Sequence, residues 1–501
     1  MLTRRSFLVR TSMAGLAAAP IGRAWPALLS PSMSVDRDIE AVTGDGRPVT
    51  LTRASVQELA DSLRGNLLLP GIPAYDLARR VRNVQIDKHP ALIVQPRGAS
   101  DVSSAVQFAR ASNLLLAVKC GGHSPSGKST CERGMQIDLS LLRGASVDPH
   151  ARIARVAGGS LLGDLDHEAM AHGLVTTAGT VSHTGVGGLT LGGGFGRLAR
   201  RFGLALDNVR AVEIVTANGA ILHANAHENA DLYWGVRGGG GNFGVVTAFE
   251  FALHPMQRPV LGGRIMFPLS QAKSVLGFYS DYEAEAPDDL SLDGFLASNA
   301  GFTGASGAGF VVCHSGPASQ AEEIMRRIRS LGTPVFDNVA AIDYVALQRS
   351  GDDSEQRAIG SYTKTGYVRT ISPQLIDTLI GGLEEHPERS VTAGFQQLGG
   401  AIARVSADAT AFPFRKVHAA ALLLANWSAT VDPAPHLKWL RQYWTTIAPY
   451  TDGFYTNDVV EESQKQVDEN YRSNYPRLVK LKNRFDPTNL FRLNANVRPS
   501  V

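Results

Sequence analysis

The sequence predicts an α+β protein with more than one domain, and three observations support this. A chain of 501 residues is long enough for two or three domains. Its 51 glycines gather in a few clusters, which indicates loops that contact a ligand. From about residue 262 onward, helical and strand-like patterns alternate and indicate a second α+β domain. The helical segments lie around 270–284, 318–331, 373–385 and 434–447, and the strand-like runs at 308–313, 400–405 and 418–427.

The first half is expected to begin with a helical lead-in and to continue with short alternating elements. Residues 36–85 are interpreted as this lead-in, which ends at the turn signals of Leu69–Pro73. Apolar residues recur with a helical period after Ser100, and Ser160 is expected to cap a helix that Gly173 ends. Strands are predicted at 114–118, 136–139 and 152–156.

A hairpin is predicted next, because Asn218-Gly219 separates two apolar runs at 212–215 and 220–223. A helix over Asp231–Val236 and a strand over Val245–Phe251 should follow. Residues 461–482 form a last helix-rich stretch. No internal repeat or low-complexity linker is visible in the sequence.

The amino terminus looks like a twin-arginine export signal. Arg4 and Arg5 stand in Thr3–Leu8, a mildly apolar run follows, and Gly22–Ala24 offers a cleavage site. That run is too short and too rich in alanine and glycine to be a stable membrane anchor. We therefore expect residues 1–35 to be signal peptide and leader, and the mature protein to be periplasmic or secreted. The alternative is a basic N-terminus without a signal.

Charge and cysteine content exclude several classes of function. Removing residues 1–24 takes away four arginines and lowers the formal net charge of +3 by four, to −1. No basic stripe interleaved with aromatic residues is visible, so nucleic acid is not an expected partner. The three cysteines form no disulfide framework, although a Cys120–Cys131 bridge stays open. No CxxC or HExxH pattern supports a metal site.

Two glycine-rich segments are the most informative part of the chain. They are Lys119–His123 and Ala178–Phe202. Glycines at this density let the backbone come within contact distance of a large flat ligand, and glycine nests can bind a pyrophosphate through backbone N–H groups. We interpret the two segments as a flavin cradle, with His123 as a candidate covalent anchor.

Two other motifs have the wrong context for the sites that they suggest. Gly122–Ser129 matches the phosphate-loop pattern GxxxxGK[ST], but another strand is expected after it, where a phosphate loop requires a helix. Gly239–Gly244 matches GxGxxG, but a strand follows it and no acidic residue lies between Glu250 and Asp281. No GxSxG pattern of a serine hydrolase occurs.

Taken together, the segments resemble the berberine-bridge-enzyme-like FAD-linked oxidases of the vanillyl-alcohol-oxidase superfamily, whose FAD-binding domain is called PCMH type. The resemblance is strong over about residues 65–260 and 450–501, and weak over 262–450. It rests on the order and spacing of several pieces: Lys119–Ser124, Gly185–Gly188, Leu191–Gly196, Gly203–Asn208, Asp231–Trp234, Arg237–Thr247, Asn474-Tyr475 and Asp486–Asn494.

The resemblance implies an FAD-binding domain made of two α/β subdomains, which the C-terminal tail completes. The FAD-binding domain would span residues 36–261, and an α+β substrate domain with an antiparallel sheet would span 262–450. Residues 451–501 would then return to the FAD domain.

The resemblance also implies the residues that contact FAD. His123 aligns with the histidine that the family bonds to the flavin, whereas Val181 replaces the cysteine of the second bond, so a single covalent link is expected. Thr184 aligns with the position that gates oxygen, and its small size favours an oxidase. The implied cofactor-binding set is Lys119, Gly121, Gly122, His123, Ser124, Gly179, Val181, Thr184, Gly185, Val186, Gly187, Gly188, Gly193, Val245, Val246, Tyr455, Asn457 and Asn494.

The catalytic residues are less well defined. Many relatives carry a Glu or Gln on the strand that here reads His418–Trp427, but Leu422 or Leu423 takes that place and no carboxylate base is visible. Tyr455 and Asn457 match a family motif that faces the flavin. Tyr455 could accept a proton only if a cation lowered its pKa, and Lys364 is the candidate for that role.

The expected function is therefore that of an exported FAD-dependent oxidoreductase. It would take hydride from an alcohol, sugar or amine carbon and pass electrons to oxygen to give hydrogen peroxide. A flavin-binding protein with little turnover, and a nucleotide triphosphatase that uses Gly122–Ser129, are the alternatives. The sequence leaves the substrate, the oligomeric state and the signal cleavage site open.

Overall fold

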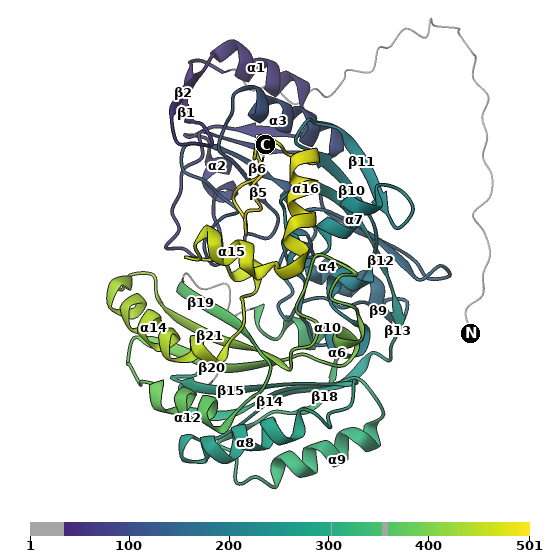
Figure 1. Ribbon diagram of the computed structural model, residues 1–501, viewed down its shortest axis with the longest axis vertical. Coiled ribbons are helices and arrows are strands. Elements are labelled where there is room, and N and C mark those ends of the chain that lie inside the picture. Colours follow the sequence, from purple (N-terminus) through teal and green to yellow (C-terminus); the bar gives the residue numbers. More distant parts are fainter. Residues whose placement is uncertain (1–34, 302, 353–358, 501) are drawn as a thin grey trace, which may run out of the picture.

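The computed structural model describes residues 35–301, 303–352 and 359–500 (Figure 1). The twin-arginine segment lies outside the described residues. In Figure 1 the N-terminal half and the C-terminal tail occupy one end of the molecule, and a large sheet with its helices occupies the other. Within the described residues, no helix is long and apolar enough to cross a membrane.

A small sheet with parallel central strands forms the first layer. Its order is β3-β4-β6-β5, in which β4 and β5 run parallel to β6 and β3 runs antiparallel to β4. The strands are β3 (Asn66–Leu68), β4 (Leu92–Gln95), β5 (Leu116–Lys119) and β6 (Met135–Asp138). Helix α3 (Ala99–Ala111) buries Val102, Ala105, Val106 and Ala109, as the helical period predicted.

The helical lead-in predicted for residues 36–85 is wrong in part. This stretch begins with an antiparallel hairpin, β1 (Ile39–Val42) and β2 (Pro48–Leu51). Helices α1 (Arg53–Ser62) and α2 (Pro73–Ala78) then flank β3. The strands escaped prediction because each has only three or four residues, too few to show a period of two.

An antiparallel five-stranded sheet forms the second layer, in the order β11-β10-β12-β8-β7. Its strands are β7 (Ala145–Asp148), β8 (Ile153–Ala157), β10 (Val209–Thr216), β11 (Ile221–Asn225) and β12 (Gly244–Ala252). The hairpin predicted at Asn218-Gly219 is confirmed, since β10 pairs with β11 around it. Helices α4 (Leu162–Met170), α5 (Val186–Gly192), α6 (Ala199–Phe202) and α7 (Ala230–Val236) and the short pair β9 (Leu174–Val175) and β13 (His254–Pro255) accompany the sheet.

The cap predicted for α4 at Ser160 is wrong. Asp164 provides the cap, because its carboxylate accepts a hydrogen bond from Leu161 N at 2.8 Å. The Ser160 hydroxyl instead bonds to the backbone of Gly144, accepting from its N–H at 3.0 Å and donating to its carbonyl at 2.9 Å.

The third layer is a sheet of eight strands with order β17-β14-β16-β15-β20-β21-β19, and β18 also pairs with β14. All its pairings are antiparallel. The strands are β14 (Pro259–Pro268), β15 (Leu290–Ser298), β16 (Gly307–His314), β17 (Phe336–Asp337), β18 (Ala340–Asp343), β19 (Ile359–Val368), β20 (Arg389–Gln397) and β21 (Ala419–Ser428). Residues 400–405, predicted as a strand, contain the short helix α13 (Ala401–Arg404), a second correction.

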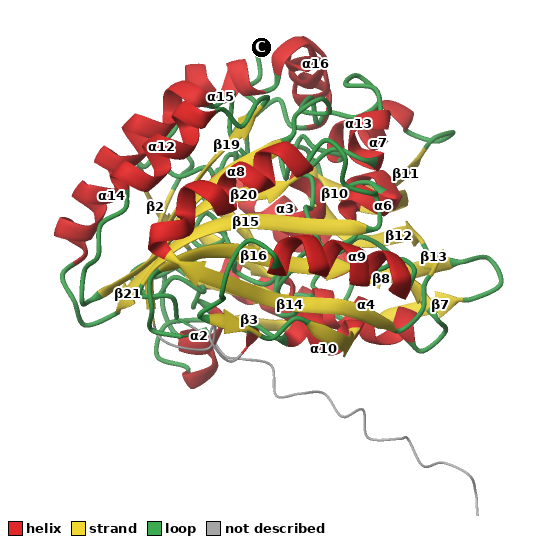
Figure 2. Cartoon of the chain, turned by 90° about the horizontal axis from the view of Figure 1, so that it is seen from below, coloured by secondary structure: helices red, strands yellow, loops and turns green. Residues whose placement is uncertain are grey.

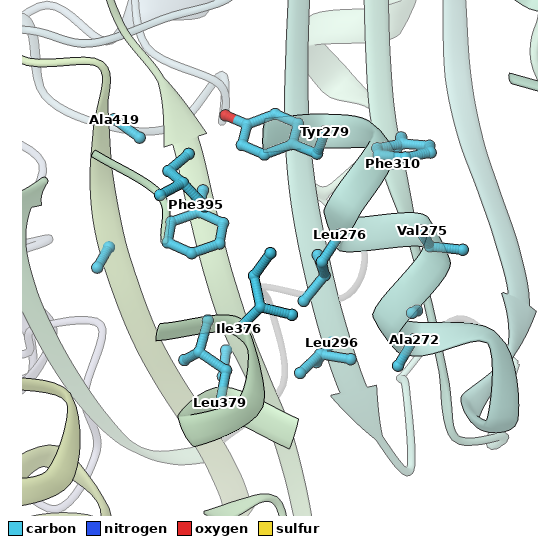
Figure 3. Packing of buried hydrophobic residues seen from close by; sticks show 14 of the residues in the cluster. Ala272, Val275, Leu276, Tyr279, Leu296, Phe310, Ile376, Leu379, Phe395 and Ala419 are labelled. Atoms are coloured by element: carbon cyan, nitrogen blue, oxygen red, sulfur yellow. The ribbon is translucent and has the colours of Figure 1, made fainter. Parts of the chain in front are cut away.

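Helices cover one face of this sheet (Figure 2). They are α8 (Ala272–Tyr282), α9 (Ala318–Arg329), α12 (Pro373–Gly382) and α14 (Pro433–Ile447), and α10 (Tyr344–Arg349) packs by β14 and β18. Figure 3 shows Val275, Leu276 and Tyr279 of α8 packed with Phe310, Phe395 and the α12 residues Ile376 and Leu379. Burying this apolar face holds the sheet and its helices together.

Strand β21 shows how the sheet separates its core from its other face. Neighbouring strand residues point to opposite faces. Ala419, Ala421 and Leu423 are buried in the core beneath the helices. Leu422 and Leu424 point the other way and line a cavity between the sheet and the rest of the molecule.

The C-terminal tail returns to the N-terminal half, where Figure 1 shows it in yellow beside the first two layers. Helices α15 (Gln464–Asn470) and α16 (Tyr475–Phe485) add Val467, Leu478 and Leu481 to the core of the five-stranded sheet. Lys482 is fully buried and donates to Asp486 Oδ2 at 2.7 Å and to the Asn242 carbonyl at 2.9 Å. This buried pair attaches the tail to the loop before β12.

Candidate active site

A cavity of about 470 Å³ lies where the three sheets and the tail meet. Its walls come from the loop after β5, the segment around α5, the start of β12, the faces of β19 and β21, and the tail at 491–495. This volume is in the usual range of about 300–1,000 Å³ for small-molecule and cofactor sites. The glycine segments singled out in the sequence therefore meet around one space.

Two glycine loops touch each other at one wall of the cavity. A Cβ on Gly121 would lie 2.3 Å from the backbone nitrogen of Gly185, and a Cβ on Gly185 would lie 2.3 Å from that of Gly121. Real Cβ atoms essentially never approach so closely, so neither position admits a side chain without a backbone shift. Gly122 has φ of 69°, in the left-handed region that favours glycine.

Other features of the wall fit a large polar ligand. A Cβ on Gly188 or Gly241 would meet no protein atom within 4 Å, although both residues line the cavity. Ser129 Oγ and Asn494 Oδ1 are buried at the cavity wall without a hydrogen-bond partner. Buried polar atoms of this kind normally have a partner, and a bound ligand can provide one.

Two cations also line the cavity. They are Arg82 and Lys128, and the Lys128 ammonium donates to the Asn494 carbonyl at 3.1 Å. Burial lowers the pKa of Lys128, and neighbouring Glu462 opposes that effect. A positively charged wall suits an anionic group such as a diphosphate. Neither residue belonged to the set that the sequence predicted as cofactor-binding.

His123 is held in the neutral form at the cavity wall. Burial, together with the nearby Arg82 and His183, lowers its pKa to about 3. Its Nε2 lies 2.7 Å from His183 Nδ1, and its Nδ1 lies 3.4 Å from Thr184 Oγ1. A neutral imidazole keeps one ring nitrogen unprotonated, so His123 can act as a nucleophile.

Tyr455 and Asn457 are fixed against the other glycine loop. The Tyr455 hydroxyl accepts hydrogen bonds from Gly194 N at 3.0 Å and from Asn457 Nδ2 at 2.8 Å. The Asn457 amide also donates to the Leu189 carbonyl at 3.2 Å. Burial raises the pKa of Tyr455, although these hydrogen bonds oppose the rise.

Lys364 does not occupy the place that the sequence suggested. Its ammonium pairs with Glu462 Oε1, and it lines neither the large cavity nor a smaller one that adjoins it. Thr363 and Thr365 present their side chains to the cavities, and strand alternation directs the residue between them away from that face. The expectation that Lys364 lowers the pKa of Tyr455 is therefore wrong, since that pKa is raised.

The structure brings most of the predicted cofactor-binding residues to the large cavity. Those that line it are Gly121, Gly122, His123, Ser124, Val181, Thr184, Gly185, Gly187, Gly188, Val245, Val246, Tyr455, Asn457 and Asn494. Four others lie elsewhere. Gly179 lines a second, smaller cavity, Val186 is fully buried inside α5, and Gly193 abuts the Tyr455 ring. Lys119 turns away, with its ammonium on the Ala78 carbonyl and 3.6 Å from Asp138.

The second cavity has a volume of about 160 Å³ and adjoins the first. The two share the lining residues Thr184, Leu189, Leu422, Tyr455 and Asp458. Sequence reasoning missed Asp458, although it directly follows the Tyr455–Asn457 motif. The signal that could have found it is this adjacency, because the whole segment from Tyr455 to Val459 lines the large cavity.

The structure also resolves the motifs that had the wrong context. Within the described residues, Gly122–Ser129 forms turns that lead to β6, and no helix follows it. Gly239–Gly244 leads into β12. The three cysteines are unpaired, and the described residues contain no group of acidic, His and Cys side chains that could hold a metal.

Comparisons with known proteins agree with this site. Residues 90–225 match the family model of an FAD binding domain, and residues 455–498 match that described as berberine and berberine like. The chain is 30% identical over 449 residues to an FAD-linked oxidoreductase of Dictyostelium discoideum, and the alignment covers 89% of this chain and 97% of that protein. It is 29% identical over 458 residues to (R)-6-hydroxynicotine oxidase of Paenarthrobacter nicotinovorans, covering 87% of this chain and 97% of the oxidase.

Solved structures show the same fold. The crystal structure of 6-hydroxy-D-nicotine oxidase from Arthrobacter nicotinovorans aligns with a TM-score of 0.80 at 28% identity, covering 88% of this chain and 99% of that one. Berberine bridge enzyme from Eschscholzia californica aligns with a TM-score of 0.77 at 23% identity, covering 89% of this chain and 99% of that one.

The fold and the cavity thus define an FAD-linked oxidoreductase with a PCMH-type FAD-binding domain. More particularly, the chain belongs to the berberine-bridge-enzyme-like family of FAD-linked oxidoreductases. The residues around the cavity fit FAD: abutting glycine loops, two cations, and buried polar atoms that still need partners.

Proposed function

We propose that this protein is an exported oxidase that takes hydride from an alcohol or amine carbon and reduces oxygen to hydrogen peroxide, with FAD bonded to His123. The observation that carries the proposal is the neutral imidazole of His123 in the wall of a cavity that adjoins a smaller one. Bound FAD would supply a two-electron acceptor. The protein's own residues would position it and the donor beside each other.

A single covalent bond to His123 is supported by the side chains around it. His183 engages Nε2 at 2.7 Å, whereas Nδ1 has only the longer contact of 3.4 Å with Thr184 Oγ1, so Nδ1 is the nitrogen that can bond to carbon. Val181 lines the cavity where a second anchor would be expected. Cys120 does not replace that anchor, since burial raises the pKa of its thiol to about 11 and it donates to the Ser160 carbonyl.

The smaller cavity supports a donor that presents a narrow, mostly apolar group. Its apolar lining consists of Leu189, Phe195, Ala420 and Leu422, and its polar side chains are those of Thr180, Thr184, Thr365, Gln396, Tyr455 and Asp458. A relative named (R)-6-hydroxynicotine oxidase and a structural neighbour named xylooligosaccharide oxidase are consistent with an amine or alcohol donor. Thr184, a small residue shared by both cavities, supports access by oxygen.

Anaerobic reduction of the purified protein tests this function. The donor panel is 6-hydroxynicotine, after the relative's name, with xylobiose and reticuline, which two structural neighbours hold. We expect bound FAD to bleach when one of these donors is added and to regain its colour when oxygen is admitted, with hydrogen peroxide formed. A protein that holds FAD but is reduced by none of these donors would contradict the proposed donor class. Return of colour without hydrogen peroxide would contradict the oxidase.

Export is supported by the arginine pair of the N-terminal segment. We expect a double Arg4→Lys, Arg5→Lys variant to accumulate inside the cell, because the twin-arginine route requires that pair. Fractionation of a bacterial host would measure this, with the Arg10→Lys variant as the matched control. Equal export of all forms would contradict the twin-arginine route.

A further inference from the structure

One carboxyl group stands where the two cavities meet. Asp458 ends the short 3-10 helix η5 (Thr456–Asp458), directly after the motif that places Tyr455. Among the described residues that line either cavity, it is the one carboxyl side chain. Its backbone N–H donates to the Tyr455 carbonyl at 2.9 Å, which fixes it in the wall.

The sheet holds polar and apolar residues around this carboxyl group. Thr365 of β19 and Leu422 of β21 are direct register partners, and both line the smaller cavity. The Thr365 hydroxyl accepts a hydrogen bond from Tyr455 N at 3.2 Å and bonds to the Asp458 side chain. Asp458 is thus supported on the wall side and faces the shared boundary of the cavities.

We propose that Asp458 is the general base that accepts the donor's hydroxyl or amine proton. This role rests on the proposed function, because it requires a donor in the smaller cavity and FAD in the larger one. It assigns a carboxylate to a reaction for which strand β21 offers only the apolar residues Ala420, Leu422 and Leu424 at the two cavities.

The step balances as a two-electron oxidation of the donor. The O–H or N–H bond breaks and its proton passes to the Asp458 carboxylate. The electron pair of that bond forms the new C=O or C=N bond. The donor carbon loses its hydrogen as hydride to FAD, so the donor is oxidised and FAD is reduced.

The charges around Asp458 suit a proton acceptor near neutral pH. Burial raises its pKa to about 7, the bond from Thr365 lowers it, and the charge of Glu462 raises it. Glu462 is itself paired with Lys364, and the uncharged hydroxyl groups of Tyr455 and Tyr367 lie close by. A base whose pKa lies near the working pH transfers protons most efficiently.

Tyr455 is the competing candidate, and its environment argues against it. Its hydroxyl already accepts two hydrogen bonds, and burial raises its pKa further from neutrality. A buried, protonated tyrosine is a poor proton acceptor, but its fixed side chain can pack against a ring system.

The first test compares Asp458→Asn with the matched control Glu461→Gln, in FAD-loaded protein. Glu461 lies three residues further along, is partly exposed in an ion pair with Arg441, and lines neither cavity. With a donor from the panel, we expect anaerobic flavin reduction to fall about 100-fold or more in Asp458→Asn, and within about twofold of wild type in Glu461→Gln. The wild-type rate should rise with pH around 7, and the Asp458→Asn rate should not.

The second test needs no donor. In the infrared difference spectrum between wild type and Asp458→Asn, both loaded with FAD, the C=O band of the Asp458 carboxyl group should disappear as pH rises through about 7. The subtraction removes the bands of Asp166 and Asp293, two other buried carboxyl groups whose pKa values are raised. Thr365→Val, measured against the same Asp458→Asn spectrum, should move this transition to higher pH because the hydrogen bond that stabilises the carboxylate is lost. The Thr365 variant keeps the carboxyl group, so its difference spectrum against wild type remains informative if Asp458→Asn does not fold.

The outcomes separate this proposal from the proposed function. If wild type and Asp458→Asn are reduced equally fast, or if the difference spectrum between them shows no carboxyl transition, the role of Asp458 is overturned and the oxidase stands. If no donor reduces wild-type FAD, the donor class fails, while the infrared transition still decides whether Asp458 exchanges a proton near neutral pH.

Discussion

The two walls of the large cavity are built in opposite ways. The wall from the N-terminal half consists of glycine loops, in which backbone meets backbone at Gly121 and Gly185. The wall from the eight-stranded sheet consists of side chains, chiefly Leu422, Leu424 and Thr363 on adjacent strands. The shape of the first wall depends on the absence of side chains at its glycines. The shape of the second depends on which side chains of the strands point into the cavity.

The comparison teaches where specificity can vary in this fold. Where its two loops abut, the backbone cradle for FAD tolerates little change, because a Cβ at Gly121 or Gly185 collides with the opposite loop. A sheet surface exchanges one side chain for another without altering its hydrogen-bonded frame. We infer that the glycine wall holds the cofactor and the sheet wall selects the donor.

The largest expected effect follows from breaking the glycine wall. Gly121→Val would place a Cβ 2.3 Å from the backbone of Gly185, so one loop must move. We expect bound FAD, measured as visible absorbance per protein, to fall about tenfold or more. Gly277→Ala in α8 is the control, because a Cβ there meets no atom within 4 Å. Equal FAD content in both variants would show that the loops do not need to touch.

The next largest effect concerns the tail that closes the glycine wall. Lys482→Met would leave Asp486 as a buried, unpaired charge, which costs about 3–5 kcal/mol of the free energy of unfolding. Lys480→Met, on the exposed face of the same helix, should change it by less than about 0.5 kcal/mol. Denaturant unfolding followed by circular dichroism measures both. Similar free energies of unfolding for the two variants would contradict the claim that the buried pair of Lys482 and Asp486 stabilises the tail.

A third prediction separates the two faces of β21. Leu423→Ala removes a fully buried core side chain and should cost about 2–5 kcal/mol of unfolding free energy with little change in the donors accepted. Leu422→Ala should cost less, because Leu422 is only partly buried, and should admit bulkier donors to the smaller cavity. Unfolding curves and a donor panel test the pair. If Leu422→Ala lost more unfolding free energy than Leu423→Ala, the assignment of Leu422 to the cavity face would be contradicted.

The smallest expected effect is the pH dependence of stability due to Asp458. Its pKa of about 7 in the folded state lies above the ordinary value of 3.8, so between these values the unfolded state releases a proton that the folded state keeps. The free energy of unfolding of wild type should therefore decrease as pH rises through this window, relative to Asp458→Asn. Thermal unfolding at about pH 5 and pH 8 measures the change. A constant difference between the two proteins would contradict the raised pKa.

The same contrast explains what the sequence could predict. The glycine loops were recognisable because their residue types and order leave few alternatives, and 14 of the predicted residues line the large cavity. The three- and four-residue strands before residue 85 were missed because such segments show no period. Lys364 was misplaced because its face depends on the register of β19 against β21, which spacing alone does not reveal.

Asp458 escaped prediction for a related reason. The sequence points to a base either on the strand where relatives carry a carboxylate or amide, which here has Leu422 and Leu423, or at Tyr455. The structure places a carboxyl group at the same cavity boundary from another element. Only the tertiary arrangement shows that Asp458 and Leu422 face one space.

The most direct test of the central claim, that the cavity holds FAD bonded to His123, is the mass of the intact protein after denaturation. Wild type should be heavier than its polypeptide by one FAD, whereas His123→Ala should have the mass of the polypeptide alone. The exposed His172→Ala should match wild type in FAD content. Wild type at the polypeptide mass, or FAD retained by the denatured His123→Ala protein, would contradict the claim.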